Sequence, residues 1–319
     1  MGASAVGIAL QVIAGETVEK NILNPFYVID ASNADDPTNW ANSTHEGAEA
    51  PADSAAVTPK IGFSLSTLGN AFFVGMRAGI VDKCDELGVE LVETNADGDI
   101  ATQAAQMEDL ISQGVTALIV NPVDSDAIVA SEKKAVEAGI PVIYCDRGST
   151  GDGYTAFIAT DNIAMGELGA NEIVKFLTER YGEPKGNVVE IQGLIGTSAA
   201  RDRGEGFNNI MKDYPNIKIV AQQAGDFNQE TSLNVMQNII QANDQIDAVY
   251  GHNDDCTLGA LKAIESAGLL KPVGEDGHIY IIGIDGIYDA LTAIKDGKKR
   301  CNYLTNSSSY GRKCSGIGS

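Results

Sequence analysis

Polar side chains that could bind a small ligand follow six apolar, strand-like runs of the chain. They include carboxylates, amides and two arginines, and the pair Phe72–Phe73 begins a helix-like run beside the first group. A sugar hydroxyl both donates and accepts hydrogen bonds, so this mixture can fix its orientation. An aromatic ring suits the apolar C–H face of a sugar. The six segments are Ser66–Asn70, Asn121–Asp126, Asp146–Arg147, Gly193–Arg201, Asn253–Asp255 and Asp285–Gly286.

Two of these features have alternative, purely structural interpretations. Phe72 and Phe73 could both be core residues, but adjacent aromatic residues do not share one helix face, so at least one is expected to face the ligand. Asp146 and Arg147 could be a solvated loop pair, but they end a strand that reads as buried. A carboxylate beside an arginine is favoured in its ionised form, which indicates a hydrogen-bond acceptor and not an acid or base catalyst.

The segment Gly193–Arg201 could be mistaken for a phosphate-binding loop. It lacks the lysine of a P-loop and the glycine spacing of a dinucleotide site, which argues against a nucleotide. Thr197 or Ser198 could instead cap the helix that follows. The segment can serve as a cap and still contribute to a ligand site.

The histidines and cysteines indicate neither a metal site nor a catalytic triad. The three histidines are scattered, and the five cysteines include no C-x-x-C pair. Buried free thiols are therefore the expected state of the cysteines inside predicted elements. These are Cys84, Cys145 and Cys256.

The composition bounds the class of protein. A chain of 319 residues with 44% apolar residues exceeds one typical domain. A formal charge of −22 and a pI of about 4.4 argue against nucleic-acid binding, which needs clustered lysine and arginine. No apolar run is long enough to cross a membrane, and residues 1–16 are interpreted as an amphipathic helix and not as a signal peptide.

The elements that must position the polar segments are alternating strands and helices. Strand-like and helix-like runs alternate from residue 60 to residue 146, and the same order returns between residues 186 and 285. Near-continuous Val, Ile and Leu in the strands is typical of parallel sheets covered on both faces. We therefore predict an α/β fold of two Rossmann-like lobes with parallel sheets, with ligands beyond the carboxyl ends of the strands.

A set of motifs then resembles one family. Six motifs are similar to the cleft signatures of ribose-binding proteins, a branch of the type I periplasmic sugar-binding proteins. They are S-T-L-G-N-A-F-F, I-V-N-P-V-D-S-D-A, C-D-R, G-T-S-A-A-R-D-R-G-E-G-F, H-N-D and G-I-D-G. The resemblance covers residues 60 to about 298. It implies a non-enzymatic venus flytrap that binds a monosaccharide, a ribose-like pentose or related hexose, in an interlobe cleft without cofactor or metal.

The resemblance also implies partners and ligand residues. It implies a monomer, periplasmic or extracellular and lipoprotein-anchored in its native relative, that delivers sugar to an ABC transporter permease or a chemoreceptor. The family's hinge-strand glutamine is not found here, and Ile284 stands where an aromatic residue is common, which leaves the sugar undetermined. The implied ligand residues are Asn70, Phe72, Phe73, Asn121, Asp146 and Arg147 in the first lobe and Arg201, Phe227, Asn253 and Asp285 in the second.

The ends of the chain depart from the family's order. Residues 1–31 resemble the family's C-terminal helix and closing strand, so the chain reads as circularly permuted, and the tail reads as the product of a frameshift. Permutation is tolerated where termini lie close together on a surface. The predicted division is a helix of the first lobe (1–24), a strand of the second lobe (25–31), a linker (32–59), the first lobe (60–161), the second lobe (162–298) and the tail (299–319).

Two other classes of protein remain as alternatives. A transcription regulator of the lac-repressor type shares the fold, and the chain could be its ligand-binding core without the DNA-binding domain, because residues 1–59 offer no basic helix-turn-helix. A sugar kinase or dehydrogenase would need a nucleotide loop, which was not found.

Overall fold

The computed structural model describes residues 1–24, 27–35, 58–299 and 301–304, and these form two compact units. The first contains residues 1–24, 58–160 and 196–198, and the second contains residues 27–35, 161–195, 199–299 and 301–304. Most of the predicted linker and residues 305–319 of the predicted tail lie outside the described residues.

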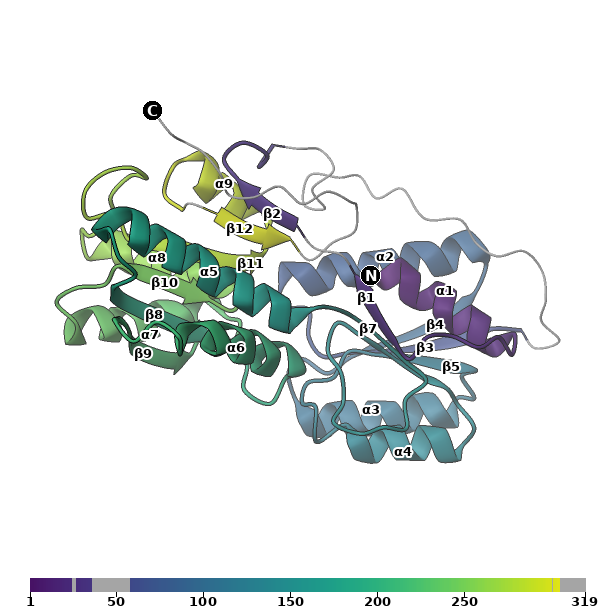
Figure 1. Ribbon diagram of the computed structural model, residues 1–319. Helices are drawn as coiled ribbons and strands as arrows, with labels where there is room; N and C mark the ends of the chain where they lie inside the picture. Colours follow the sequence, from purple (N-terminus) through teal and green to yellow (C-terminus); the bar gives the residue numbers. More distant parts are fainter. Residues whose placement is uncertain (25–26, 36–57, 300, 305–319) are drawn as a thin grey trace. The chain divides into compact units, whose positions relative to one another are not determined.

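The first unit is built on a six-stranded sheet in which all pairings are parallel (Figure 1). Four helices cover it: α1 and α2 share a core with one face, and α3 and α4 share a core with the other. The strand order is β1 (Asn21–Asn24), β7 (Ala156–Thr160), β6 (Val142–Cys145), β5 (Ala117–Val120), β3 (Lys60–Leu65) and β4 (Glu90–Asn95). The helices are α1 (Gly2–Ile13), α2 (Ala71–Leu87), α3 (Ile100–Ser112) and α4 (Val129–Glu137).

The second unit repeats this plan with one antiparallel edge. Its strand order is β2 (Tyr27–Asp30), β12 (Cys301–Leu304), β11 (Tyr280–Asp285), β10 (Ala248–Gly251), β8 (Gly186–Gln192) and β9 (Ile217–Ala224). Among the described strands of this sheet, only β2 runs antiparallel to its neighbour, β12. The helices are α5 (Asn162–Tyr181), α6 (Ser198–Met211), α7 (Gln229–Ala242), α8 (Asp254–Ser266) and α9 (Tyr288–Lys295).

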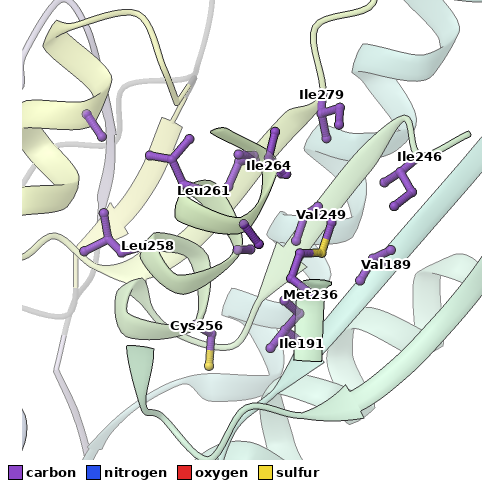
Figure 2. Packing of buried hydrophobic residues seen from close by; sticks show 14 of the residues in the cluster. Val189, Ile191, Met236, Ile246, Val249, Cys256, Leu258, Leu261, Ile264 and Ile279 are labelled. Carbon is purple, nitrogen blue, oxygen red and sulfur yellow. The ribbon is translucent and has the colours of Figure 1, made fainter. Parts of the chain in front are cut away.

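Apolar cores lie on both faces of the second sheet. On one face, Phe176 and Phe207 of α5 and α6 stack on Tyr280 and Tyr250, with ring centroids 4.7 and 4.4 Å apart. On the other, Met236 of α7 and residues of α8 and α9 pack on Val189, Val249 and other strand residues (Figure 2). Burial on both faces explains why the central strands are mostly apolar, as parallel strands usually are.

The α/β fold with two parallel-sheet units is the fold class predicted from the sequence. The sequence pattern did not predict β1, β7 or α5. The strand β1 has only four residues and is partly exposed along its length, so it carries no apolar run to signal it. The described part of the chain has no helix of the length and apolarity needed to cross a bilayer.

Candidate functional site

In the first unit, the predicted ligand residues gather where β3, β5 and β6 end. Asn121 follows β5, Asp146 and Arg147 follow β6, and Asn70 caps the helix after β3. All four side chains are at least nine-tenths buried. We call Asn70, Phe72, Phe73, Asn121, Asp146 and Arg147 the first half-site.

Hydrogen bonds, most of them to uncharged partners, hold Asn121 at the centre of the first half-site. Its amide donates to the Cys145 carbonyl at 2.9 Å and contacts Asp146 Oδ2 at 3.5 Å, while Ser66 Oγ donates to its Oδ1 at 2.5 Å. Gln103 Nε2 donates to the Asn121 carbonyl at 3.0 Å. Because every one of these partners is buried, the amide is fixed in orientation before any ligand arrives.

The aromatic pair supports the polar groups in different ways. The guanidinium of Arg147 lies over the ring of Phe73, with 4.8 Å from Cζ to the ring centroid. This cation–π contact holds the plane of the guanidinium against the ring. Phe72 is less buried, packs edge-to-face against Phe73, and donates its backbone N–H to the Asn70 side chain at 2.7 Å.

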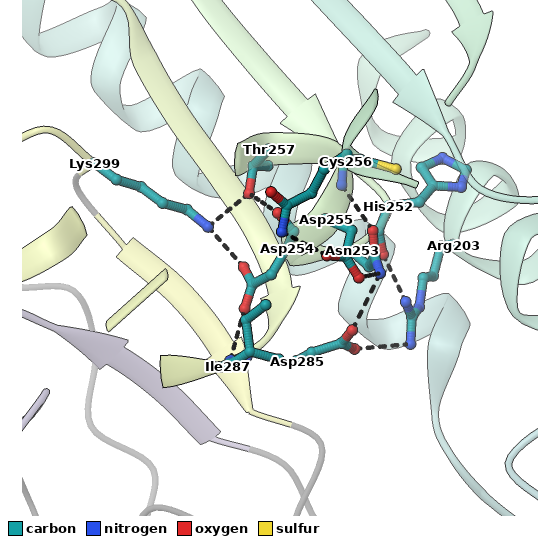
Figure 3. A network of polar contacts seen from close by, with 12 residues as sticks. Arg203, His252, Asn253, Asp254, Asp255, Cys256, Thr257, Asp285, Ile287 and Lys299 are labelled. Atoms are coloured by element: carbon teal, nitrogen blue, oxygen red, sulfur yellow. Dashed lines mark hydrogen bonds and ion pairs between the residues drawn. The ribbon is translucent and has the colours of Figure 1, made fainter. Parts of the chain in front are cut away.

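In the second unit, α6, β10 and β11 bring together an arginine, an amide and a carboxylate. Arg203 is buried and donates to Asn162 Oδ1 at 2.9 Å and to the His252 carbonyl at 2.6 Å, and its NH2 lies 3.8 Å from Asp285 Oδ1. The Asn253 amide donates to Asp285 Oδ2 at 3.3 Å (Figure 3). With Phe227, these residues form what we call the second half-site: Arg203, Phe227, Asn253 and Asp285.

Phe227 owes its position to a glycine on the neighbouring strand end. A Cβ at Gly193 would lie 2.0 Å from Cζ of the Phe227 ring, so only glycine leaves room for it. Phe227 has φ of +55°, and its ring centroid lies 5.8 Å from Cζ of Arg203. The ring therefore stands beside the guanidinium, as Phe73 does beside Arg147.

Strained backbone marks the strand-end aspartates. Asp146 has φ of +69° and Asp285 has φ of +112°, conformations that non-glycine residues rarely adopt. Such strain costs of order 1–3 kcal/mol and persists only where surrounding structure enforces it, typically at functional sites. Both carboxylates are buried, so each is presented in a fixed direction.

Within the first unit, the structure places the six predicted residues of that lobe near one another, and within the second unit it does so for three of the four predicted there. Arg201 is placed apart from them. Its side chain is 56% exposed and pairs with the adjacent Asp202 at 2.8 Å. Arg203, which sequence reasoning missed, is the arginine beside Asp285. The helical periodicity of the sequence could have indicated Arg203. It precedes the buried Phe207 by four residues, so both side chains lie on the same inward face of the helix.

Burial shifts the protonation of two side chains next to the second half-site. Burial raises the pKa of Asp255, which accepts a hydrogen bond from Gln229 at 2.9 Å. His252 is fully buried, and burial lowers its pKa although its Nε2 lies 2.9 Å from Glu190 Oε1.

Among the side chains that the structure describes, we find neither a metal cluster nor a reactive thiol. Within the described ranges, no group of three or more His, Cys, Asp and Glu side chains is arranged to hold a metal ion. The cysteines whose side chains are described, Cys84, Cys145 and Cys256, are buried and free, as predicted. Burial raises the pKa of each of these thiols, to about 11 for Cys84 and about 12 for the other two, so none is an activated nucleophile.

The chain has relatives among known proteins. A family model described as periplasmic binding protein domain matches residues 61–315. The ribose import binding protein of Bacillus subtilis is 37% identical over 263 residues, which cover 82% of this chain and 79% of that protein. The ribose import binding protein of Escherichia coli is 38% identical over 238 residues, which cover 75% of this chain and 76% of that protein.

Solved structures of similar fold include sugar complexes. A galactofuranose binding protein has a TM-score of 0.70 at 34% identity, covering 76% of this chain and 81% of its own. An ABC transporter solute binding protein from Actinobacillus succinogenes with bound D-allose has a TM-score of 0.66 at 33% identity. The match covers 76% of this chain and 83% of that protein's chain. These matches and the two parallel-sheet units identify the chain as a member of the periplasmic binding protein family, a family of non-enzymatic solute receptors.

Proposed function

We propose that this chain binds a monosaccharide, a ribose-like pentose or a related hexose, and passes it to the permease of an ABC transporter. The observation that carries the proposal is the shared composition of the two half-sites. Each contains an asparagine, a strand-end aspartate, an arginine and a phenylalanine ring. This set provides acceptors, forked donors and an apolar face, which together match a sugar ring with its hydroxyls.

The two half-sites are proposed to bind the same sugar molecule, in the interlobe cleft predicted from the sequence. Relatives support a transport role, because those described include ribose import proteins and ABC transporter proteins with bound D-allose or myo-inositol. They do not favour the alternative of a transcription regulator. Delivery to a chemoreceptor, a monomeric state and a lipoprotein-anchored, periplasmic or extracellular location are further proposals by analogy.

The circular permutation also stays a proposal. It is supported by the placement of the N-terminal segment, in which α1 and β1 belong to the first unit and β2 forms the edge of the second. The strand β12 belongs to the segment predicted as the tail. In the second sheet it lies between β11 and β2, so residues 301–304 form part of that sheet. Sequencing the gene tests the frameshift. The proposal requires that the codons of the tail, read in another frame, can encode a hinge strand like that of the family, for which we propose S-D-A-T-I-S-Q-I-P-P-R.

A thermal-shift panel tests the binding function. The sugars are D-ribose, D-allose, D-galactose, D-xylose, D-fructose and myo-inositol, and ATP and NAD serve as controls for an enzyme. A ligand that binds only the folded state raises Tm, so at least one sugar is expected to do so and neither nucleotide is. No shift with any sugar, or a shift with a nucleotide, would contradict the proposal.

A further inference from the structure

The loop that follows Asp285 is held by a buried charged pair. Asp285 has φ of +112° and is followed by Gly286 with φ of +71°. Backbone of this kind needs external hydrogen bonds to stay in place, because the aspartate itself favours other conformations. The partners of the next two backbone N–H groups therefore decide where the Asp285 carboxylate lies.

Both of those N–H groups donate to a single carboxylate oxygen. Oδ2 of Asp254 accepts from Gly286 N at 2.7 Å and from Ile287 N at 3.0 Å. Asp254 is the first residue of α8, directly after Asn253, and its side chain has no exposed surface. Hydrogen bonds between amides and an ionised carboxylate are shorter and stronger than neutral ones.

The other oxygen of Asp254 is bound by Lys299. Nζ of Lys299 lies 2.7 Å from Asp254 Oδ1 and 2.9 Å from Thr257 Oγ1 (Figure 3). The Lys299 and Asp254 side chains are both fully buried, so each compensates the charge of the other. Lys299 precedes β12, so this contact also joins the start of β12 to α8.

We propose that Lys299 is a positioning residue for the sugar-binding carboxylate of Asp285. Lys299 holds the carboxylate of Asp254 in place, Asp254 fixes the amides of Gly286 and Ile287, and these amides hold Asp285 in its strained conformation. Lys299 belongs to neither half-site and acts on the ligand only through this chain of contacts. The inference rests on the proposed function, because it assumes that Asp285 contacts the sugar.

The first test needs no sugar. Hydrogen exchange of the Gly286 and Ile287 amides is measured by NMR in the ligand-free protein and in the Lys299→Met variant, whose side chain has similar length and no charge. Both amides are expected to exchange at least about tenfold faster in the variant, since local opening becomes easier. The control is Lys298→Met, because Lys298 is 42% exposed and its Nζ lies 3.9 Å from Glu265. Unchanged exchange in Lys299→Met would overturn the proposal.

The second test separates positioning from a general loss of stability. D-ribose affinity is measured calorimetrically for Lys299→Met in the parent and in the Asp285→Asn background. If Lys299 acts through Asp285, Lys299→Met should weaken D-ribose binding about tenfold or more in the parent protein. The same substitution should weaken binding much less in the Asp285→Asn background, because the two changes are coupled. An equal loss in both backgrounds would show a merely structural role and overturn the proposal.

A double variant keeps the test informative if Lys299→Met folds poorly. In Asp254→Asn with Lys299→Met the buried charges are removed together, and the amide oxygen can still accept from Gly286 and Ile287. This variant is expected to recover most of the Tm lost by Lys299→Met and to restore slow exchange at both amides. Recovery of Tm with exchange still fast would contradict the chain of contacts. If the parent does not bind D-ribose, the exchange results still decide the role of Lys299, and only the proposal of D-ribose as ligand fails.

Discussion

The two half-sites use the same four kinds of side chain but are supported in different ways. In the first, Asn121 and the strand end at Asp146 are held by uncharged partners, chiefly Ser66, Gln103 and backbone carbonyls. In the second, the supports are buried ionisable groups: Asp254 with Lys299, and Glu190 with His252 below Arg203. The same ligand chemistry can therefore be presented by a neutral scaffold or by a charged one.

This difference has energetic consequences. Uncharged hydrogen bonds between buried groups change little with pH, whereas buried titratable pairs tie the geometry of a site to protonation. Removing one partner of a buried charged pair leaves the other uncompensated, which is more costly than losing a neutral hydrogen bond. We expect the second half-site to be the more sensitive of the two to substitution and to acid.

The largest expected effect comes from the arginine that the sequence analysis missed. Arg203→Ala should weaken sugar binding by roughly 2–5 kcal/mol, because it removes a buried donor and leaves Asp285 without it. Arg201→Ala should cost about 0.5 kcal/mol or less, as surface substitutions usually do. Calorimetric titration with D-ribose compares the two. Equal losses of binding free energy would show that Arg201 also belongs to the site. A larger loss for Arg201→Ala would show that Arg203 does not.

A smaller effect is expected from the glycine below Phe227. Gly193→Ala places a methyl group 2.0 Å from the ring, so the ring must move. We expect a loss of about 1–3 kcal/mol in stability, as overpacking typically causes, together with weaker ribose binding. The matched control is Gly7→Ala in α1, where a Cβ meets nothing within 4 Å. Thermal melting of both variants checks this. A Gly193→Ala protein as stable as the Gly7→Ala protein would show that the Phe227 ring can move aside without loss of packing.

The smallest effect is a pH dependence confined to the second unit. The pKa of His252 is lowered by burial, and the charged groups that face it are Glu190 and Arg203. The unfolded chain therefore takes up the proton first, and the free energy of unfolding should fall below about pH 6.5, by up to about 1.4 kcal/mol per pH unit. Above that pH both states are neutral at this position and the contribution is constant.

The control for this effect is His252→Gln. Glutamine can still donate to Glu190 but does not titrate, so urea unfolding between pH 7 and pH 5 should show a flatter profile than in the parent. Parallel profiles for the two proteins would mean that His252 does not contribute to the pH dependence of stability. Protonation would then not weaken the charged support of the second half-site between pH 7 and pH 5.

The sequence predicted much of this fold, and it pointed to most of the candidate site, for identifiable physical reasons. Buried parallel strands are mostly apolar, so β3, β5, β8, β10 and β11 were recognisable, and ligand-binding side chains were expected beyond their carboxyl ends. The short edge strand β1 gave no such signal. Arg203 was missed because two arginines stand two residues apart, and only the inward face of α6 distinguishes them.

Lys299 could not have been predicted from the sequence. A lysine near the end of a chain is usually solvated, and its burial depends on Asp254, which lies 45 residues earlier and belongs to another element. The positive φ of Asp146 and Asp285 is likewise a product of tertiary contacts, since aspartate alone does not require it.

The central claim is that both half-sites bind one sugar, and calorimetric stoichiometry tests it most directly. D-ribose is titrated into the parent and into Asp146→Ala and Asp285→Ala, with Asp109→Ala on the exposed face of α3 as control. The account predicts a single ribose per chain in the parent, binding weakened by roughly 2–5 kcal/mol in either half-site variant, and no change in the control. Two riboses per chain, or either variant binding a full equivalent at the parent's affinity, would contradict it.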